Sequence, residues 1–307
     1  KVGVYVILRL WTLLFSPDAG PSAQFGSAWL VGGGMVTMAF GAVGMLGSQR
    51  LGHLAGFAAI SSSGTLLAAV GMGHNQLTGG LLYYLLSSTV AVSALFLLTD
   101  LIERWRNDGF SVAPYERKDD APFLSADLVH SASAPLDDDE QEVIGEVIPA
   151  AAAFLGLAFI TCTLVVAGLP PLSGFIGKFA LIHALLNPLG LGAAGAPLAM
   201  SSWVMVGLML VSGLFALVAL TRVGVLHFWS AHDRAAPKLL VMEGLPVALL
   251  VLMCAALAWK AGPVLRYTEA TANALHAPAG YIRAVMSAQP VPNPTAAPAG
   301  SQQETRP

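Results

Sequence analysis

A single lysine lies inside the longest apolar region of the sequence. This region runs from Ile148 to Leu186, and Lys178 is its only Asp, Glu, Lys or Arg residue. A charged side chain at the centre of a bilayer costs about 2.5–3.5 kcal/mol on insertion scales, so such residues are usually functional. The alternative is that Lys178 reaches an interface along its own stem, which requires a helix end nearby. We interpret Lys178 as a candidate proton carrier.

Two prolines interrupt this region shortly before the lysine. Proline lacks an N–H and clashes with the carbonyl four residues earlier, so the carbonyls of Val166 and Ala167 lose their helical partners. In lipid, such a break normally lines a wet cavity. The positive end of the second half-helix points at the same place, and together with desolvation it favours the neutral amine of Lys178. The predicted break comprises Gly168, Pro170, Pro171 and Gly174.

Polar residues in other apolar stretches are further candidates. Lys1 precedes the apolar run from Val2 to Phe15, and it is either an interfacial lysine or a second proton carrier. In membranes, hydroxyl groups most often join helices or bond to their own backbone, although they can also hold a water chain for protons. The candidate hydroxyl relay consists of Ser61, Ser62, Ser87 and Ser88.

The composition argues against several other classes of protein. Of the 307 residues, 55% are hydrophobic and 11% are charged, whereas soluble domains carry about 25% charged residues. A net charge of −3 does not suggest a nucleic-acid partner. Cys162 and Cys254 form no C-x-x-C pattern, no pair of histidines is placed to ligate a haem, and the acidic run 137–140 lacks EF-hand spacing. We therefore expect no metal and no cofactor.

The apolar stretches predict an all-α polytopic membrane protein. About 20 residues are needed to cross the hydrocarbon layer, and stretches of this kind recur along the chain. A polar segment at 99–146 interrupts them, and the Ala-, Pro-, Gln- and Ser-rich composition at 278–307 predicts a disordered tail. The apolar stretches are 2–15, 28–46, 54–72, 77–98, 148–186, 202–226 and 239–261.

The positive charges predict how the region around Lys178 crosses the membrane. If residues 148–186 make one crossing, the basic connections all fall on one side. Two crossings would put Arg234 and Lys238 on the wrong side, so the positive-inside rule favours one discontinuous span. This count puts the 99–146 loop in the cytoplasm and the C-terminal tail outside. The opposite connections, which contain no Lys or Arg, are 16–27, 73–76 and 187–201.

The motif at residues 168–179, Gly-Leu-Pro-Pro-Leu-Ser-Gly-Phe-Ile-Gly-Lys-Phe, resembles the broken-helix motif of the antiporter-like subunits. This family includes the D subunit of Mrp-type (also called Mnh or Pha) sodium/proton antiporters and the proton-pumping subunits of respiratory complex I. Residues 1–9, 59–64 and 82–98 are similar to the family's eighth, tenth and eleventh helices, and the resemblance extends over about residues 1–260. The D subunits of the Pha kind are the most similar, because their eleventh helix tolerates Ser-Ser-Thr.

The resemblance implies a fold with two inverted five-helix repeats, each containing one broken helix. On that template, residues 1–16 are a truncated transmembrane helix that ends the first repeat, 28–226 are the second repeat, and 239–261 are the last transmembrane helix. Because the sequence begins inside an apolar run without a methionine, we expect it to be a C-terminal fragment. Lys1 and Lys178 would be the proton-carrying lysines.

Three positions depart from the family pattern. Many relatives have a histidine where Ser62 stands and another where Ser88 stands, and some have a lysine near Val92. Proton transfer between Lys1 and Lys178 would therefore depend on hydroxyl groups and water.

The resemblance also implies a function. It indicates a proton-translocating subunit of a multi-subunit monovalent cation (Na⁺ or K⁺)/proton antiporter, which works with other subunits in a bacterial inner membrane and is a secondary transporter rather than an enzyme. The alternative is a proton-pumping membrane subunit of a complex I-like NADH–quinone oxidoreductase or a related hydrogenase complex. A third interpretation is a scaffold subunit in which Lys178 merely pairs with a carboxylate.

The topology can be tested by cysteine labelling. A membrane-impermeant thiol reagent added from outside should label a cysteine introduced at 187–201 and should leave one at 99–146 unlabelled, because the basic residues hold the second segment in the cytoplasm. Labelling of both segments from the same side would rule out the single discontinuous crossing.

Overall fold

The structure is nearly all helical, which confirms the predicted fold class. Six of the helices in the computed structural model are long and apolar enough to cross a bilayer, namely α2, α3, α4, α6, α8 and α9. The described residues are 1–16, 19–110, 150–188, 198–228 and 241–288. The helices are α1 (Val2–Leu14), α2 (Ser27–Gly47), α3 (Leu51–Met72), α4 (Asn75–Phe110), α6 (Ala150–Ala167), α7 (Ser173–Leu186), α8 (Met200–Phe228), α9 (Val241–Trp259), α10 (Ala261–His276) and α11 (Ala279–Met286), with a 3₁₀ turn η1 (Gly20–Ser22).

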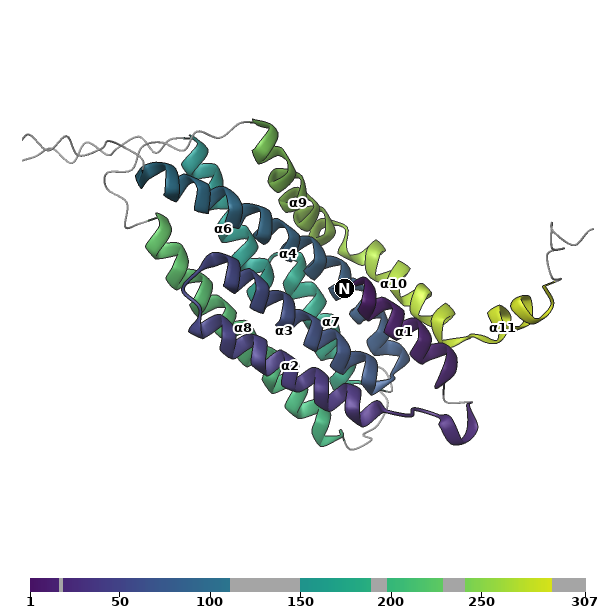
Figure 1. The fold of residues 1–307 in the computed structure, drawn as a ribbon. Coiled ribbons are helices and arrows are strands. Elements are labelled where there is room, and N and C mark those ends of the chain that lie inside the picture. The colour runs from purple at the N-terminus through teal and green to yellow at the C-terminus, as the bar shows by residue number, and fades with distance from the viewer. Residues whose placement is uncertain (17–18, 111–149, 189–197, 229–240, 289–307) are drawn as a thin grey trace, which may run out of the picture.

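The long helices lie side by side in a bundle (Figure 1). Helices α4 and α8 finish at the end of the bundle where α6 begins, and α7 finishes at the opposite end, where α8 begins. Together α6 and α7 therefore run once through the bundle, interrupted by residues 168–172. One discontinuous membrane crossing by α6 and α7 stays a prediction.

Two apolar clusters fill the two ends of the bundle. The first includes the buried side chains of Leu54, Leu98 and Leu220, from α3, α4 and α8. The second includes the buried side chains of Leu8, Leu66 and Leu181, from α1, α3 and α7. The middle of the bundle, between these clusters, holds the polar residues that form the candidate site.

Helix α4 is longer than the sequence predicts. The composition predicts a polar loop from Thr99 onward, but α4 continues to Phe110. In this extension Arg104 forms ion pairs with Asp100, one turn earlier, and with Glu243 of α9, at 2.9 and 2.8 Å. A change to polar composition does not end a helix whose polar side chains bind one another. The remainder of the expected loop lies outside the described residues.

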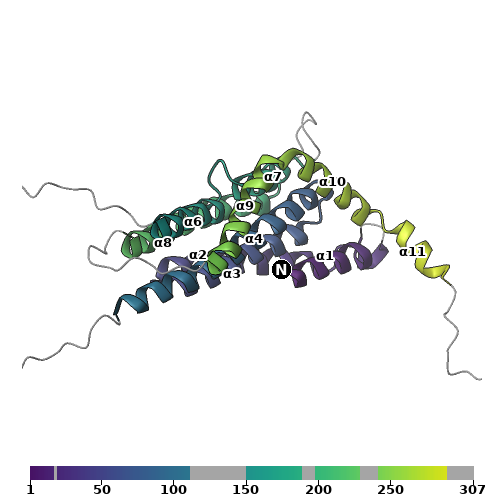
Figure 2. The ribbon, with the colours of Figure 1, turned by 90° about the horizontal axis from the view of Figure 1, so that it is seen from above.

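Two helices follow α9, and one of them lies in the segment for which composition predicts disorder. Residues 279–286 form α11, which extends away from the bundle beyond α10 (Figure 2). The guanidinium carbon of Arg9 lies 4.7 Å from the ring centroid of Tyr281, a cation–π contact that ties α11 to α1. The composition of residues 278–307 as a whole is polar and proline-rich, so it does not reveal this short apolar helix. Residues 289–307 lie outside the described residues.

Helices α2 and α3 approach each other to backbone contact. A Cβ atom at Gly41 would lie 2.5 Å from the backbone nitrogen of Ser61, and one at Gly64 would lie 2.7 Å from the carbonyl oxygen of Gly34. Real side chains cannot occupy these positions, so glycine permits the approach, as small residues commonly do between membrane helices. The contact fixes the part of α3 that carries Ser61 and its neighbours.

This contact predicts a stability difference between two glycines of α2. Gly41→Ala should lower the free energy of unfolding by about 1–3 kcal/mol, the usual cost of overpacking. Gly33→Ala is the matched control, because no atom beyond its own stretch of α2 lies within 4 Å of its Cβ position, and it should leave stability unchanged or raise it by up to about 1 kcal/mol, the advantage of alanine over glycine in a helix. Thermal unfolding of the two variants in detergent measures the difference, and equal effects would contradict the backbone contact.

Candidate functional site

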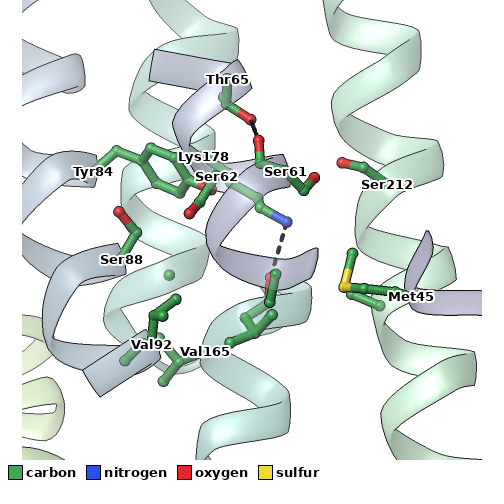
Figure 3. Close-up of a pocket in the computed structure, with 15 residues that line it drawn as sticks. Met45, Ser61, Ser62, Thr65, Tyr84, Ser88, Val92, Val165, Lys178 and Ser212 are labelled. Carbon is green, nitrogen blue, oxygen red and sulfur yellow. Dashed lines mark hydrogen bonds between the residues drawn. The ribbon is translucent and has the colours of Figure 1, made fainter. Parts of the chain in front are cut away.

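A small cavity lies in the middle of the bundle, between the two apolar clusters. It has about 20 Å³ of space for the centre of a water-sized sphere, which is room for about one water molecule. Figure 3 shows the amine of Lys178 inside it, with Ser61 and Ser62 of α3 on one side and Ser212 of α8 on the other. The polar lining residues are Ser61, Ser62, Thr65, Tyr84, Ser88, Lys178 and Ser212.

The amine of Lys178 binds the backbone carbonyls that the two prolines leave free. Its Nζ donates to the carbonyl oxygen of Ala167 at 2.8 Å and to that of Val166 at 3.2 Å. The sequence predicts that these two carbonyls need water or side-chain partners, and in the structure a side chain supplies both bonds. The half-buried lysine and the two carbonyls therefore satisfy one another.

Two opposing influences act on the charge of Lys178. The sequence predicts a neutral amine, because desolvation and the positive, N-terminal end of α7 both disfavour the ammonium form. The amine also contacts the C-terminal carbonyls of α6, where the helix dipole is negative. These acceptors favour the ammonium form and so oppose the desolvation.

Glycines shape the break itself. Gly168 has φ +81°, a left-handed conformation that other residues rarely adopt. The N–H groups of Gly168 and Leu169 both donate to the carbonyl of Leu164, at 3.0 and 2.9 Å, which closes the end of α6. Gly174, in the first turn of α7, lies directly against the carbonyl of Val165. The break residues identified in the sequence thus bring α6 and α7 into close contact.

Lys1 reaches the same cavity through two serines. Its Nζ donates to the hydroxyl oxygen of Ser62 at 2.8 Å and to that of Ser88 at 2.6 Å. Both serines line the cavity that contains Lys178. The structure therefore brings the two candidate lysines and two of the candidate serines together around one small space.

The other two candidate serines differ from each other. Ser61 lines the cavity, as the hydroxyl-relay hypothesis expects. Ser87 is fully buried and donates to the hydroxyl of Ser173 at 2.9 Å, between α4 and the start of α7. In this position Ser87 joins helices, which is the packing alternative to a relay.

Three polar residues of the cavity are not among the predicted site residues. Thr65 and Tyr84 lie one turn from predicted residues and line the cavity, as does Ser212. Ser212 is followed by Gly213 in the middle of an apolar stretch, and this Ser-Gly pair is the one feature that could have indicated it. Its meaning depends on α8 packing against the break, which the sequence does not reveal.

Metal-binding groups are not assembled in the described parts of the chain. Among those residues, no group of three or more His, Cys, Asp or Glu side chains could hold a metal ion. Cys162 and Cys254 are free and buried.

Comparison with known proteins gives consistent relatives. No family model matches the chain. It is 45% identical over 290 residues to the D subunit of the probable K(+)/H(+) antiporter of Rhizobium meliloti, an alignment that covers 94% of this chain and 51% of the relative. It is 26% identical to the D subunit of the Na(+)/H(+) antiporter of Bacillus subtilis, over 93% of this chain and 49% of that one. The chain thus spans about half the length of these curated relatives.

Two solved structures share the fold. The Mrp complex from Dietzia sp. matches with a TM-score of 0.65 and 17% identity, covering 93% of this chain and 53% of the matched chain. Respiratory complex I from Thermus thermophilus matches with a TM-score of 0.61 and 21% identity, covering 90% and 49%. At these identities the similarity shows the fold alone.

The contacts of Lys1 predict a difference between two adjacent serines. Ser62 and Ser63 both donate to the carbonyl of Ala59, at 3.0 and 2.8 Å, but only Ser62 also accepts a bond from Lys1. Ser62→Ala should lower the free energy of unfolding by about 1.5–3 kcal/mol, the usual contribution of a hydrogen bond to a charged group. Ser63→Ala should have a much smaller effect. Thermal unfolding of both variants provides the test, and equal losses would mean that the Lys1 contact adds nothing to stability.

Proposed function

The chain belongs to the same family as the D subunits of bacterial K⁺/H⁺ and Na⁺/H⁺ antiporters, and from that premise we propose that it is the proton-translocating part of a multi-subunit monovalent cation/proton antiporter. The observation that carries this proposal is the position of Lys178. Its amine binds two free carbonyls at a helix break, beside a cavity with room for water. An amine held there can take up and release protons without leaving the protein interior.

The proposed proton path runs between the two lysines. Ser62 and Ser88 accept hydrogen bonds from Lys1 and also line the cavity that Lys178 enters. One water in that cavity would complete a chain of hydroxyl groups and water between the two amines. A proton leaving Lys1 would pass to Ser62 or Ser88, which accept from its amine and now donate to backbone carbonyls. The serine hydroxyl would turn from its carbonyl and donate its own proton to this water, and the water would donate one to the neutral amine of Lys178.

The transported cation is Na⁺ or K⁺ in this proposal. The relative with 45% identity is named for K⁺/H⁺ antiport, whereas the relative with 26% identity is named for Na⁺/H⁺ antiport. K⁺ is therefore the first cation to test. Other subunits of a hetero-oligomeric complex would be needed for antiport, and the complex would reside in a bacterial inner membrane.

The exposed apolar faces support a location within lipid and among other subunits. Large apolar side chains on α2 and α9 point away from the bundle, including Trp29, Val36, Leu249 and Leu252. A multi-pass membrane protein covers such faces with lipid or with neighbouring membrane helices.

A second candidate function is that of a proton-pumping subunit of a redox complex. The shared fold with complex I, at a TM-score of 0.61, favours keeping this alternative. Both functions would use Lys1 and Lys178. Neighbouring genes for small antiporter subunits would support the antiporter, whereas genes for hydrophilic iron–sulfur subunits would support the pump.

The role of Lys178 is tested by two substitutions in the full-length protein within its assembled complex. Lys178→Ala should abolish proton flux in vesicles because it removes the amine. The complex should still assemble, because alanine suits a helix and water entering the vacated space can donate to the Val166 and Ala167 carbonyls. Lys178→Arg should fail nearly as completely, because guanidinium keeps its proton and cannot titrate.

The arginine variant separates a proton carrier from a scaffold. If Lys178 only supplied a positive charge to a partner, arginine would restore function. Near-normal proton flux from the assembled Lys178→Arg complex would therefore remove Lys178 from the proton path.

A further inference from the structure

We infer that Gly213 of α8 is a positioning residue, whose missing side chain keeps open the slot in which the ammonium group of Lys178 binds the carbonyl of Ala167. This inference rests on the proposed function, because it assigns Gly213 a role in proton transfer by Lys178. It differs from the helix break itself, since Gly213 lies on another helix that packs against the break.

The geometry of the slot follows from its two glycine walls. A Cβ atom at Gly213 would lie 2.7 Å from the carbonyl oxygen of Ala167 and 3.3 Å from Nζ of Lys178. A Cβ atom at Gly168 would lie 2.5 Å from Cδ of Lys178 and 3.1 Å from its Nζ. The amine thus lies next to two places where any side chain would intrude.

A methyl group at position 213 would disturb the lysine more than its surroundings. The carbonyl of Ala167 is backbone at the end of a helix, and α8 packs against α2, α3, α6 and α7, so neither moves easily. The lysine stem is the flexible partner. The amine should therefore move away from Ala167 and lose the 2.8 Å hydrogen bond, which makes the ammonium form less stable relative to the free amine.

The use of glycine here has no local explanation in the helix itself. Glycine in a helix interior is about 1 kcal/mol less favourable than alanine. Gly207, earlier in α8, has no atom within 4 Å of its Cβ position, so there an alanine would meet open space. Gly213 differs from Gly207 in facing both the carbonyl and the amine of the site.

Few other titratable groups face Lys178. Helices α2, α3, α4, α6 and α8 contribute lining residues to the cavity, and among these Tyr84 of α4 is the other titratable side chain. Lys1 reaches the cavity through Ser62 and Ser88. If a substitution at Gly213 alters the pH dependence of proton flux, the altered group should therefore be one of the two lysines. Because Gly213 faces Lys178, we assign the change to Lys178.

The test compares Gly213→Ala with Gly207→Ala in the full-length protein within its assembled complex. The first readout is acylation of Lys178 by acetic anhydride, quantified by peptide mass spectrometry, because only the free amine reacts. Gly213→Ala should raise this rate about tenfold at fixed pH, the effect expected from losing one hydrogen bond to a charged group. The second readout is the pH profile of proton flux, whose alkaline limb should move about one pH unit lower. Gly207→Ala should change neither.

The outcomes separate this inference from the proposed function. Faster acylation with an altered pH profile supports both. Faster acylation with an unchanged pH profile supports the role of Gly213 in positioning the amine, but it means that protonation of Lys178 does not limit the rate of transport. The Lys178→Ala variant tests the role of Lys178 in transport independently. Acylation equal to that of Gly207→Ala overturns the inference. Loss of assembly by Gly213→Ala alone also overturns it, because the glycine would then serve helix packing.

Discussion

The site depends on one constraint, which is that backbone carbonyls inside a bilayer must find hydrogen-bond donors. Two prolines deprive Val166 and Ala167 of helical partners, and no bulk water is available at that depth. Lys178 has the complementary need, since an amine among apolar residues requires acceptors. The bonds between them meet both needs at once. The glycines of the break and the small cavity provide the space in which the amine of Lys178 can reach the two carbonyls.

Much of the arrangement could be predicted from sequence because hydrophobic length and proline chemistry are local. The apolar stretches correspond to helices α2, α3, α8 and α9 within a few residues at both ends, and to α4 at its beginning. The break before Lys178 and the two orphan carbonyls follow from the Pro170-Pro171 pair alone. The direction in which the lysine turns could not be predicted, because it depends on the three-dimensional angle between α6 and α7.

Most of the features that the sequence does not predict depend on contacts between residues far apart in the chain. Ser87 and Ser88 are adjacent in sequence, yet one joins α7 and the other binds Lys1. Helix period alone separates their directions, but it does not say which neighbour each one meets. Gly213 likewise gains its importance from the carbonyl of Ala167, which is distant in sequence. The extension of α4 escapes prediction because polar composition is typical of a loop.

The length of α4 has a mechanical consequence. With 36 residues and a rise of 1.5 Å per residue, the helix is ~54 Å long, much longer than the ~30 Å hydrocarbon layer. One rigid rod therefore carries Tyr84 and Ser88 at the cavity and Arg104 at an ion-paired end far from it. A movement of that end along the helix axis would therefore also move the residues at the cavity. If α4 shifted along its axis by the rise of one residue, Ser88 would move away from Lys1. The projecting end of α4 is therefore a place from which the hydrogen bonds at the cavity can be changed.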